Sequence, residues 1–442
     1  MNKRYAFWRM PNGGPYRGVD GKHAPHDVLA GLSKHASVTG KGSLGISSFA
    51  FWQYESAIQN AIVILNPDGV ELNENDTGTI LRAAILDSLS DLSADEAVKS
   101  SKFMTKTNAQ ASRHFRKTVK DFVLISRLSI DTFPRQRLTI NGREVAPLTD
   151  NQTYYAFPDV VNKQWVQDSV GFRSDASEWQ QIRVKTSGRT IHEATDNALE
   201  ALHLLRGLWT LIASFGSWSI NIGVPERKAV GIIHAGPIHT LHHPGGQSVK
   251  DIYWYERESY GPRKLFRPKN GWDGLERQRR WAARRLRQLP YQSELEELIV
   301  RYVQALDHSD LEVAFLQLWS ILEKITATIG GNYDQTIRRC TWIFRDSGVA
   351  AEVLNGLRAR RNRYVHAAKS DGEWGQNVYA AKSFVEHHLF HLLRNRFGVD
   401  TIDEYGEQLS LPRQMNALKK RRHQVKHAIQ MVKKQLGMSD EH

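Results

Sequence analysis

Residues 311–324 read LEVAFLQLWSILEK, and this stretch decides the fold of the C-terminal part of the chain. Its large apolar residues recur at helical spacing, at Phe315, Leu318, Trp319 and Leu322. That spacing places them on one face of an α-helix and predicts that this face packs into a core. Glu323 follows at the edge of the apolar stripe, where its carboxylate can pair with a cation on a neighbouring helix.

Helical periodicity continues on both sides of this stretch, from about residue 275 to the end of the chain. Asp310 is placed to cap the helix, Gly330-Gly331 should end it, and Pro290 should end an earlier helix. The pattern predicts helices over residues 274–288, 291–307, 310–329, 333–346, 349–365, 374–396 and 412–436.

The first half of the chain has a mixed pattern. Asn141-Gly142 lies between two apolar runs and predicts a two-residue hairpin turn. Apolar residues at helical spacing predict helices over residues 78–120 and 191–214. Strands are expected at residues 49–52, 61–65, 122–125, 138–140 and 179–185. The expected fold class is therefore α+β, with a mixed α/β N-terminal region, an all-α helical bundle and a basic C-terminal helix.

A change of composition near residue 275 gives the expected domain organisation. Residues 1–272 form the mixed region, which would act as a sensor or specificity module. Residues 273–289 form an arginine-rich connecting helix, residues 290–400 the helical domain, and residues 401–442 the basic C-terminal helix.

The chain has 442 residues and a formal net charge of +13, which points to a polyanionic partner. Nucleic acid is favoured over membrane, because no run approaches the roughly 18 consecutive apolar residues of a membrane span. The N-terminus lacks the apolar core of a signal peptide. Cys340 is the single cysteine, which excludes an internal disulfide and fits a reducing cytoplasm. We therefore expect a cytoplasmic protein with no membrane contact.

Arg361, Asn362 and His366 carry the groups that RNA cleavage needs, and Arg361 and His366 are expected to lie near each other where a helix ends. Histidine can move a proton near neutral pH, and arginine offers a fixed charge and donors that match phosphate oxygens. The ribose 2′-hydroxyl is the nucleophile, so neither a metal nor another cofactor is required. The Arg-x4-His spacing alone is weak, because it occurs twice, at Arg361–His366 and Arg422–His427, about as often as chance predicts.

Context separates the two pairs. Only the first follows a Phe-Leu-x-Leu-Trp-x-x-Leu-Glu helix, at residues 315–323, and precedes a closing helix at residues 374–396. With Leu357-x3-Arg361-Asn362-x3-His366 between them, the stretch from about 300 to 396 resembles the HEPN superfamily, most closely its Apea-like branch. The resemblance covers about a quarter of the chain. The pair on the C-terminal helix lacks this context and is interpreted as a decoy.

The resemblance implies a HEPN helical domain over residues 290–400 and a metal-independent endoribonuclease. It also implies a homodimer whose two motifs face a shared cleft, structured RNA such as tRNA as substrate, and a toxin or phage-defence role. In the expected mechanism His366 exchanges protons with the 2′-hydroxyl or the leaving oxygen, and Arg361 stabilises the charge of the phosphate. Asn362 orients either the histidine ring or the phosphate. Glu323 would hold Arg361 in place. Products would carry a 2′,3′-cyclic phosphate.

RNA contacts are expected on the connecting helix, where arginines surround a tryptophan that could stack on bases. The candidates are Arg277, Arg280, Trp281, Arg284, Arg285 and Arg287, and Arg279 lies among them. The C-terminal helix combines basic residues with an apolar stripe, and it is expected to dock by that stripe and to expose the basic face.

Other signals are weak. Gly40–Gly45 has the spelling of a dinucleotide loop, but it leads towards a strand, whereas the fingerprint requires a helix. Histidines at 23, 26, 234, 239, 242 and 243 have no zinc-site spacing, so no metal site is expected there.

Two rival functions stay open. One is a non-catalytic module for RNA binding or dimerisation. The other is a sensor, in which the N-terminal region binds a small molecule or a phage protein as trigger and the helical domain only transmits the signal.

Overall fold

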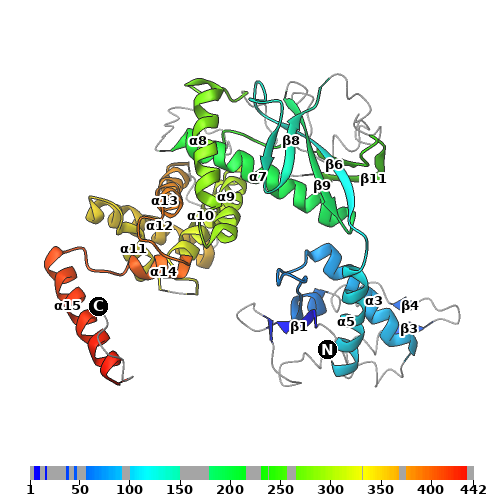
Figure 1. The fold of residues 1–442 in the computed structure, drawn as a ribbon, viewed down its shortest axis with the longest axis horizontal. Coiled ribbons are helices and arrows are strands. Elements are labelled where there is room, and N and C mark those ends of the chain that lie inside the picture. The colour runs from blue at the N-terminus through cyan, green and yellow to red at the C-terminus, as the bar shows by residue number, and fades with distance from the viewer. Residues whose placement is uncertain are drawn as a thin grey trace. The chain divides into compact units, whose positions relative to one another are not determined.

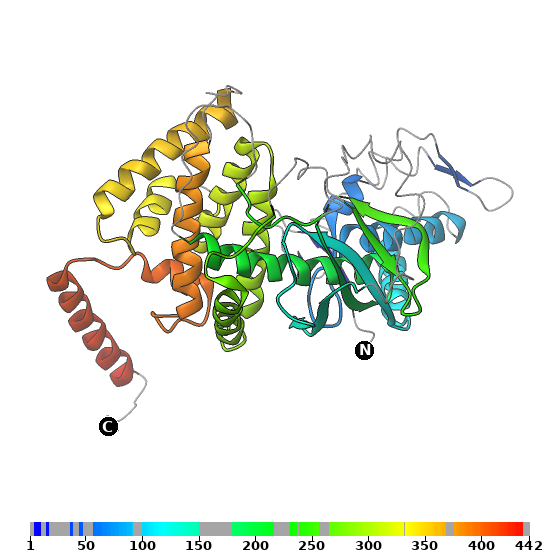
Figure 2. The ribbon, with the colours of Figure 1, turned by 90° about the horizontal axis from the view of Figure 1, so that it is seen from above.

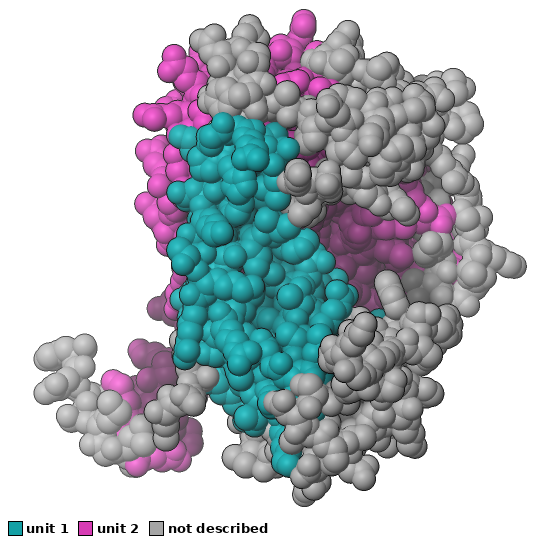
Figure 3. Space-filling view, turned by 90° about the vertical axis from the view of Figure 1, so that its right-hand side faces the viewer, with its two compact units in different colours: residues 1–124, 185–199, 241–249 teal, residues 125–184, 200–240, 250–442 magenta. Residues whose placement is uncertain are grey.

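The structure is a computed structural model, and it describes residues 4–9, 15–16, 36–38, 44–46, 56–91, 100–149, 179–215, 230–236, 238–255, 265–330, 332–367 and 375–435. The chain packs as two compact units (Figure 3). One consists of residues 1–124, 185–199 and 241–249, and the other of residues 125–184, 200–240 and 250–442. The two units are defined by which parts of the chain pack together. The domain boundaries expected at residues 272, 289 and 400 stay a prediction.

The first unit has a small core between two helices and an antiparallel sheet. Helices α3 (Glu74–Asp91) and α5 (Ser100–Phe115) pack on the sheet β2-β1-β5, formed by Pro15–Tyr16, Ala6–Arg9 and Ile62–Ile64. Strands β3 (Ala36–Val38) and β4 (Leu44–Ile46) form a separate pair. Residues 78–120 were expected to be helical, and the structure has two helices there, since α3 ends at Asp91 and α5 runs from Ser100 to Phe115. The strand expected at residues 49–52 lies outside the described residues.

A second antiparallel sheet has the strand order β11-β10-β6-β9-β8-β7 (Figure 1). Its strands are Ser248–Tyr255, Ile238–His242, Lys120–Leu128, Gln180–Gly188, Arg143–Pro147 and Leu138–Ile140 in that order. The β7–β8 hairpin turns at Asn141 and Gly142, which have φ angles of 47° and 73°. Positive φ at both central residues matches a type I′ turn, which glycine and asparagine tolerate best. The hairpin prediction is therefore confirmed.

Helix α7 (Ile191–Ser214) follows this sheet with the bounds that its apolar stripe predicted. Asn197 Nδ2 donates to the Ser187 carbonyl at 3.1 Å, which holds the start of the helix against β9. Residues 201–211 are buried on every side of the helix. At Gly207 a Cβ atom would lie 2.8 Å from Ile299 Cγ2, so this glycine permits close packing of α7 on α9.

The helices from α8 to α14 form a bundle around α10 (Figure 1, Figure 2). In chain order they are α8 (Gly271–Leu286), α9 (Gln292–Asp307), α10 (Leu311–Ile325), α11 (Tyr333–Thr341), α12 (Ser347–Ala367), α13 (Gly375–Arg394) and α14 (Ile402–Gln408). Helix α15 (Met415–Gln435) follows the bundle in the chain. Helix α10 packs against α9 and α13. Its predicted stripe is buried, with Phe315 and Leu318 fully enclosed. The fold is α+β, with a mixed N-terminal region and a helical C-terminal part.

Several details of the bundle departed from expectation, among them the end of α11, which lies at Thr341 instead of residue 346. Helix α10 ends at Ile325 instead of residue 329, and directly after it the carbonyls of Thr326 and Ala327 accept hydrogen bonds from Arg339 at 2.5 and 3.2 Å. Short α14 had no counterpart among the expected helices. The N-cap prediction is confirmed, since Asp310 accepts from the backbone N–H of Glu312 at 2.9 Å.

Candidate functional site

Helix α12 presents the predicted trio near its C-terminal end. The helix continues through residue 367, so about 100° of rotation separates successive residues. Position 366 therefore lies only about 40° around the axis from Asn362 but about 140° from Arg361. The expectation that Arg361 and His366 would adjoin at a helix end needs correcting, because within one chain the unbroken helix places them on different faces. The His366 side chain lies outside the described part of the structure.

Arg361 continues the core-facing stripe of α12, one turn after the buried Leu357. Its guanidinium carbon lies 4.9 Å from the centroid of the Tyr333 ring, at the start of α11. Such a cation–π contact fixes the plane of the guanidinium without neutralising its charge. Sequence reasoning missed Tyr333, and only its place directly after Asn332, the N-cap of α11, could have drawn attention to it.

Glu323 is connected to Arg361 through aromatic rings. Its Oε1 accepts a hydrogen bond of 2.8 Å from Trp319 Nε1, one turn earlier on α10. The Trp319 ring lies 6.4 Å from the Tyr333 ring, centroid to centroid. Among the described residues no ion pair joins Glu323 to Arg361. The residue expected to hold Arg361 directly instead fixes the tryptophan behind the tyrosine on which Arg361 rests.

The trio contains two polar atoms that lack an internal partner. Arg361 Nε and Asn362 Oδ1 are both buried, and neither has a hydrogen bond in the described structure. An unsatisfied buried polar atom costs about 1–3 kcal/mol, so proteins keep few of them without reason. Neighbouring Arg358 differs, because it forms an ion pair with Asp334. One donor and one acceptor on consecutive residues therefore lack a partner in the described structure.

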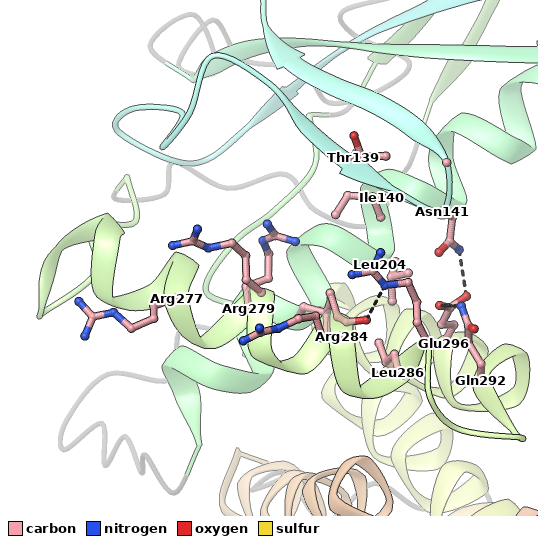
Figure 4. A pocket seen from close by; sticks show the side chains of 15 residues that line it. Thr139, Ile140, Asn141, Leu204, Arg277, Arg279, Arg284, Leu286, Gln292 and Glu296 are labelled. Atoms are coloured by element: carbon pink, nitrogen blue, oxygen red, sulfur yellow. Dashed lines mark hydrogen bonds between the residues drawn. The ribbon is translucent and has the colours of Figure 1, made fainter.

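A second candidate feature is a groove of about 830 Å³ in the larger unit (Figure 4). Its sides are the tip of the β7–β8 hairpin and helix α8, and Leu204 and Leu208 of α7 also line it. Five arginines of α8 line it as well: the buried Arg279, and four that share one face of the helix, Arg277, Arg280, Arg284 and Arg287. Their spacing of three and four residues makes a stripe about 15 Å long. We call this feature the arginine groove.

The four stripe arginines are exposed, and none of them forms an ion pair in the described structure. The carboxylate of Glu296 lies at one end of the groove, where it accepts hydrogen bonds from Asn141 Nδ2 at 3.0 Å and Gln292 Nε2 at 2.8 Å. Its charge does not balance four guanidinium groups. The groove is therefore a concave site with unpaired positive charge, which suits phosphate groups.

Three other residues of α8 have structural roles. Arg279 is buried, and its Nε and Nη2 donate to Glu276 at 2.8 and 2.9 Å. Glu276 also accepts from Trp209 Nε1 at 2.7 Å, so this ion pair joins α8 to α7. Arg285 donates to the Arg394 carbonyl at 3.1 Å. Neither Arg285 nor half-buried Trp281 lines the groove, and the groove's described lining holds no aromatic ring for base stacking.

The C-terminal helix α15 differs from its prediction. It was expected to dock by its apolar stripe, but Val425, Ile429 and Val432 are 51%, 53% and 51% exposed. The stripe is therefore uncovered within one chain. The Arg422–His427 pair lies on this helix, where both residues are exposed, and His427 Nε2 contacts His423 Nε2 at 3.0 Å.

His234 and His239 are buried, and each contacts a polar side chain inside the fold. His234 Nδ1 lies 2.9 Å from Asp307 Oδ1, and Arg206 Nη2 lies 2.6 Å from Asp307 Oδ2. Burial would raise the pKa of Asp307, but the charges and hydrogen bonds of Arg206 and His234 outweigh it and lower that pKa. His239 Nδ1 pairs with Ser126 Oγ at 2.9 Å. The described residues contain no cluster of three or more metal-ligating side chains, and residues 23 and 26 lie outside them.

Comparison with known proteins identifies no relative: no family model, no curated protein and no solved structure matches this chain. In the described part of the chain, no helix combines the length and the apolar character that crossing a membrane requires.

Proposed function

We infer that this protein is a HEPN-type endoribonuclease that cleaves RNA without a metal ion. The observation that carries the proposal is the pair of unsatisfied buried atoms, Arg361 Nε and Asn362 Oδ1, on the helix that also carries His366. The order of motifs in the sequence gives independent support, because the tryptophan–glutamate helix packs behind the tyrosine that supports Arg361.

In the proposed reaction the ribose 2′-oxygen attacks the neighbouring phosphorus. A bond forms between them, and the bond from phosphorus to the 5′-oxygen of the next nucleotide breaks. The proton of the 2′-hydroxyl goes to a base and the leaving 5′-oxygen takes up a proton, and His366 would serve in these transfers. Arg361 would stabilise the charge on the phosphorane, and Asn362 would orient the phosphate or the histidine. The products are a 2′,3′-cyclic phosphate and a 5′-hydroxyl.

A homodimer would complete the site. Because one continuous helix separates positions 361 and 366 by about 140°, a single α12 does not direct both at one phosphate. Two copies of α12 that face each other could combine the arginine of one protomer with the histidine of its partner. This arrangement agrees with the dimer that the HEPN resemblance implies.

The arginine groove would hold the RNA by its backbone. Four arginines without carboxylate partners and without an aromatic neighbour in the groove suit phosphates and ribose better than bases. Binding would therefore depend little on base sequence. A role in host arrest against phage remains part of the proposal, as does a cytoplasmic location.

The reaction is tested with total RNA and purified protein in EDTA, followed by analysis of the new ends. The proposal expects 2′,3′-cyclic phosphate and 5′-hydroxyl ends. A synthetic RNA with a single 2′-deoxynucleotide at a mapped cut site should resist cleavage there, while an all-ribose copy is cut. Cleavage of the 2′-deoxy bond at an equal rate would reject attack by the 2′-hydroxyl.

A further inference from the structure

Helix α15 contains a regular heptad pattern. Over Met415–Gln435 the apolar stripe follows the a and d positions of a coiled coil, at Met415, Leu418, Val425, Ile429 and Val432, with Arg422 at the remaining a position. An a/d stripe of period 3.5 makes a narrow seam that a second helix covers by inserting side chains between those of the first. The β-branched residues at three of these positions are typical of such seams.

No described part of the chain covers the seam. Four of its apolar residues are more than half exposed: Met415, Val425, Ile429 and Val432, at 65%, 51%, 53% and 51%. In proteins most of the stability of a helix comes from the packing of its apolar face. A contiguous exposed apolar surface on a folded protein usually marks an interaction site.

The charges beside the seam indicate its occupant. Positions e carry Lys419, Lys426 and Lys433, position g carries Arg421, and the whole helix has no acidic residue. In a parallel pair of two copies Arg421 would face Lys426, and in an antiparallel pair the lysines at e would face one another. Like charges across a coiled coil oppose pairing, so a second copy of α15 fits poorly.

Other polyanions fit less well. An RNA backbone would neutralise the lysines but leave the apolar seam in water. A membrane-surface helix usually inserts large aromatic or leucine side chains, and residues 415–435 contain no aromatic side chain other than the two histidines, which are polar. We propose that α15 is a docking helix for a different protein, whose own amphipathic helix carries apolar a and d residues flanked by glutamate or aspartate. This proposal does not depend on the ribonuclease proposal.

The lone arginine in the seam would add specificity. Arg422 at an a position is costly to bury opposite an apolar residue, so it selects a partner with an acidic or polar residue at the facing position. A single polar residue of this kind fixes the register and the orientation of the two helices. The partner helix should therefore have one acidic residue within an otherwise apolar seam.

The test uses the full chain and two synthetic helical peptides. Both have isoleucine at a and leucine at d, with one glutamate opposite Arg422. One carries glutamate and the other lysine at every e and g position. By fluorescence anisotropy the acidic peptide should bind at least about tenfold more tightly than the basic one. The double variant Lys419→Glu, Lys426→Glu should reverse this preference.

A matched pair of variants tests the seam itself. Ile429→Asp places a charge in the seam and should abolish binding of the acidic peptide. Met431→Asp changes an equally apolar residue that is 65% exposed but lies outside the seam, and it should leave binding unchanged. Equal affinity for both peptides, or equal loss in both variants, would overturn the proposal.

Two further outcomes would assign the seam to another occupant and so reject the proposal. Sedimentation of the parent as a dimer that Ile429→Asp alone converts to a monomer would assign the seam to a second copy. Binding to phosphatidylserine vesicles that is lost with Ile429→Asp, without any binding of the acidic peptide, would assign it to a lipid surface.

Discussion

Replacing Arg280 and Arg284 together by glutamine removes two of the four exposed guanidinium groups that line the arginine groove. Both side chains are exposed and neither forms an ion pair in the described structure, so folding should be little affected. If each stripe arginine neutralises one phosphate of single-stranded RNA, it contributes about −0.7 to the slope of log affinity against log salt concentration. The parent slope should then be about −2.8 and the variant slope about −1.4.

These slopes predict different sensitivities to salt. Between about 50 and 200 mM salt the parent should lose about 50-fold in affinity and the double variant only about sevenfold. The assay is fluorescence anisotropy with a labelled single-stranded RNA, in a His366→Ala background to prevent cleavage. Two RNAs of unrelated sequence should give the same slopes, because the groove is proposed to contact phosphates and ribose and not bases.

The matched control is the double variant Arg113→Gln, Arg116→Gln. It removes the same charge from exposed positions at the end of α5, outside the groove. Its slope should equal that of the parent. A slope that stays near −2.8 without Arg280 and Arg284, or that falls equally in the control, would refute the groove as the RNA-binding site.

Three predictions concern stability, all measured by urea unfolding. Arg279→Gln leaves the Glu276 carboxylate buried without its cation and should cost about 3–5 kcal/mol, while Arg277→Gln, two residues away and exposed, should cost less than about 0.5 kcal/mol. Similar losses in both would contradict the buried pair. Burial lowers the pKa of His388 from 6.5 to about 4, so the folded state resists its protonation. The contribution of neutral His388 to the free energy of unfolding is complete above pH 6.5. It is lost as the pH falls towards 4, and the total loss is about 3 kcal/mol. The parent should lose this amount relative to His388→Gln, and a constant difference between the two across that range would exclude the effect. Gly142→Ala forces a Cβ into the left-handed region at φ 73° and should cost about 1–2 kcal/mol, and an unchanged midpoint would show that this turn does not need glycine.

Local patterns in the sequence predicted most of the helices and the β7–β8 hairpin. The apolar stripe of α7 gave both of its ends, and Asn141-Gly142 gave the hairpin with its positive φ angles. These features depend on neighbours within a few residues, where helix and strand periodicities are strong. Directly after the end of α10, the carbonyls of Thr326 and Ala327 accept hydrogen bonds from Arg339, which lies on another helix. No local pattern encodes that contact.

The candidate sites were only partly predictable for the same reason. Arg361 was identified by its motif, but its support is Tyr333, about thirty residues away and in no motif. The arginines of α8 were recognisable as a basic cluster, yet the hairpin that makes them into a groove lies more than a hundred residues earlier. Glu276 was overlooked although it stands only three residues before Arg279, because spacing alone does not tell which of seven basic or aromatic neighbours turns inward.

The most direct test of the ribonuclease proposal compares four proteins on one RNA in EDTA: the parent, His366→Ala, Arg361→Ala and His427→Ala. The last removes the histidine of the second Arg-x4-His pair, which lies exposed on α15. We predict that His366→Ala slows cleavage by about 10²–10⁴-fold and Arg361→Ala by a comparable factor, whereas His427→Ala cleaves at the parent rate. Cleavage by His366→Ala at the parent rate would contradict the account.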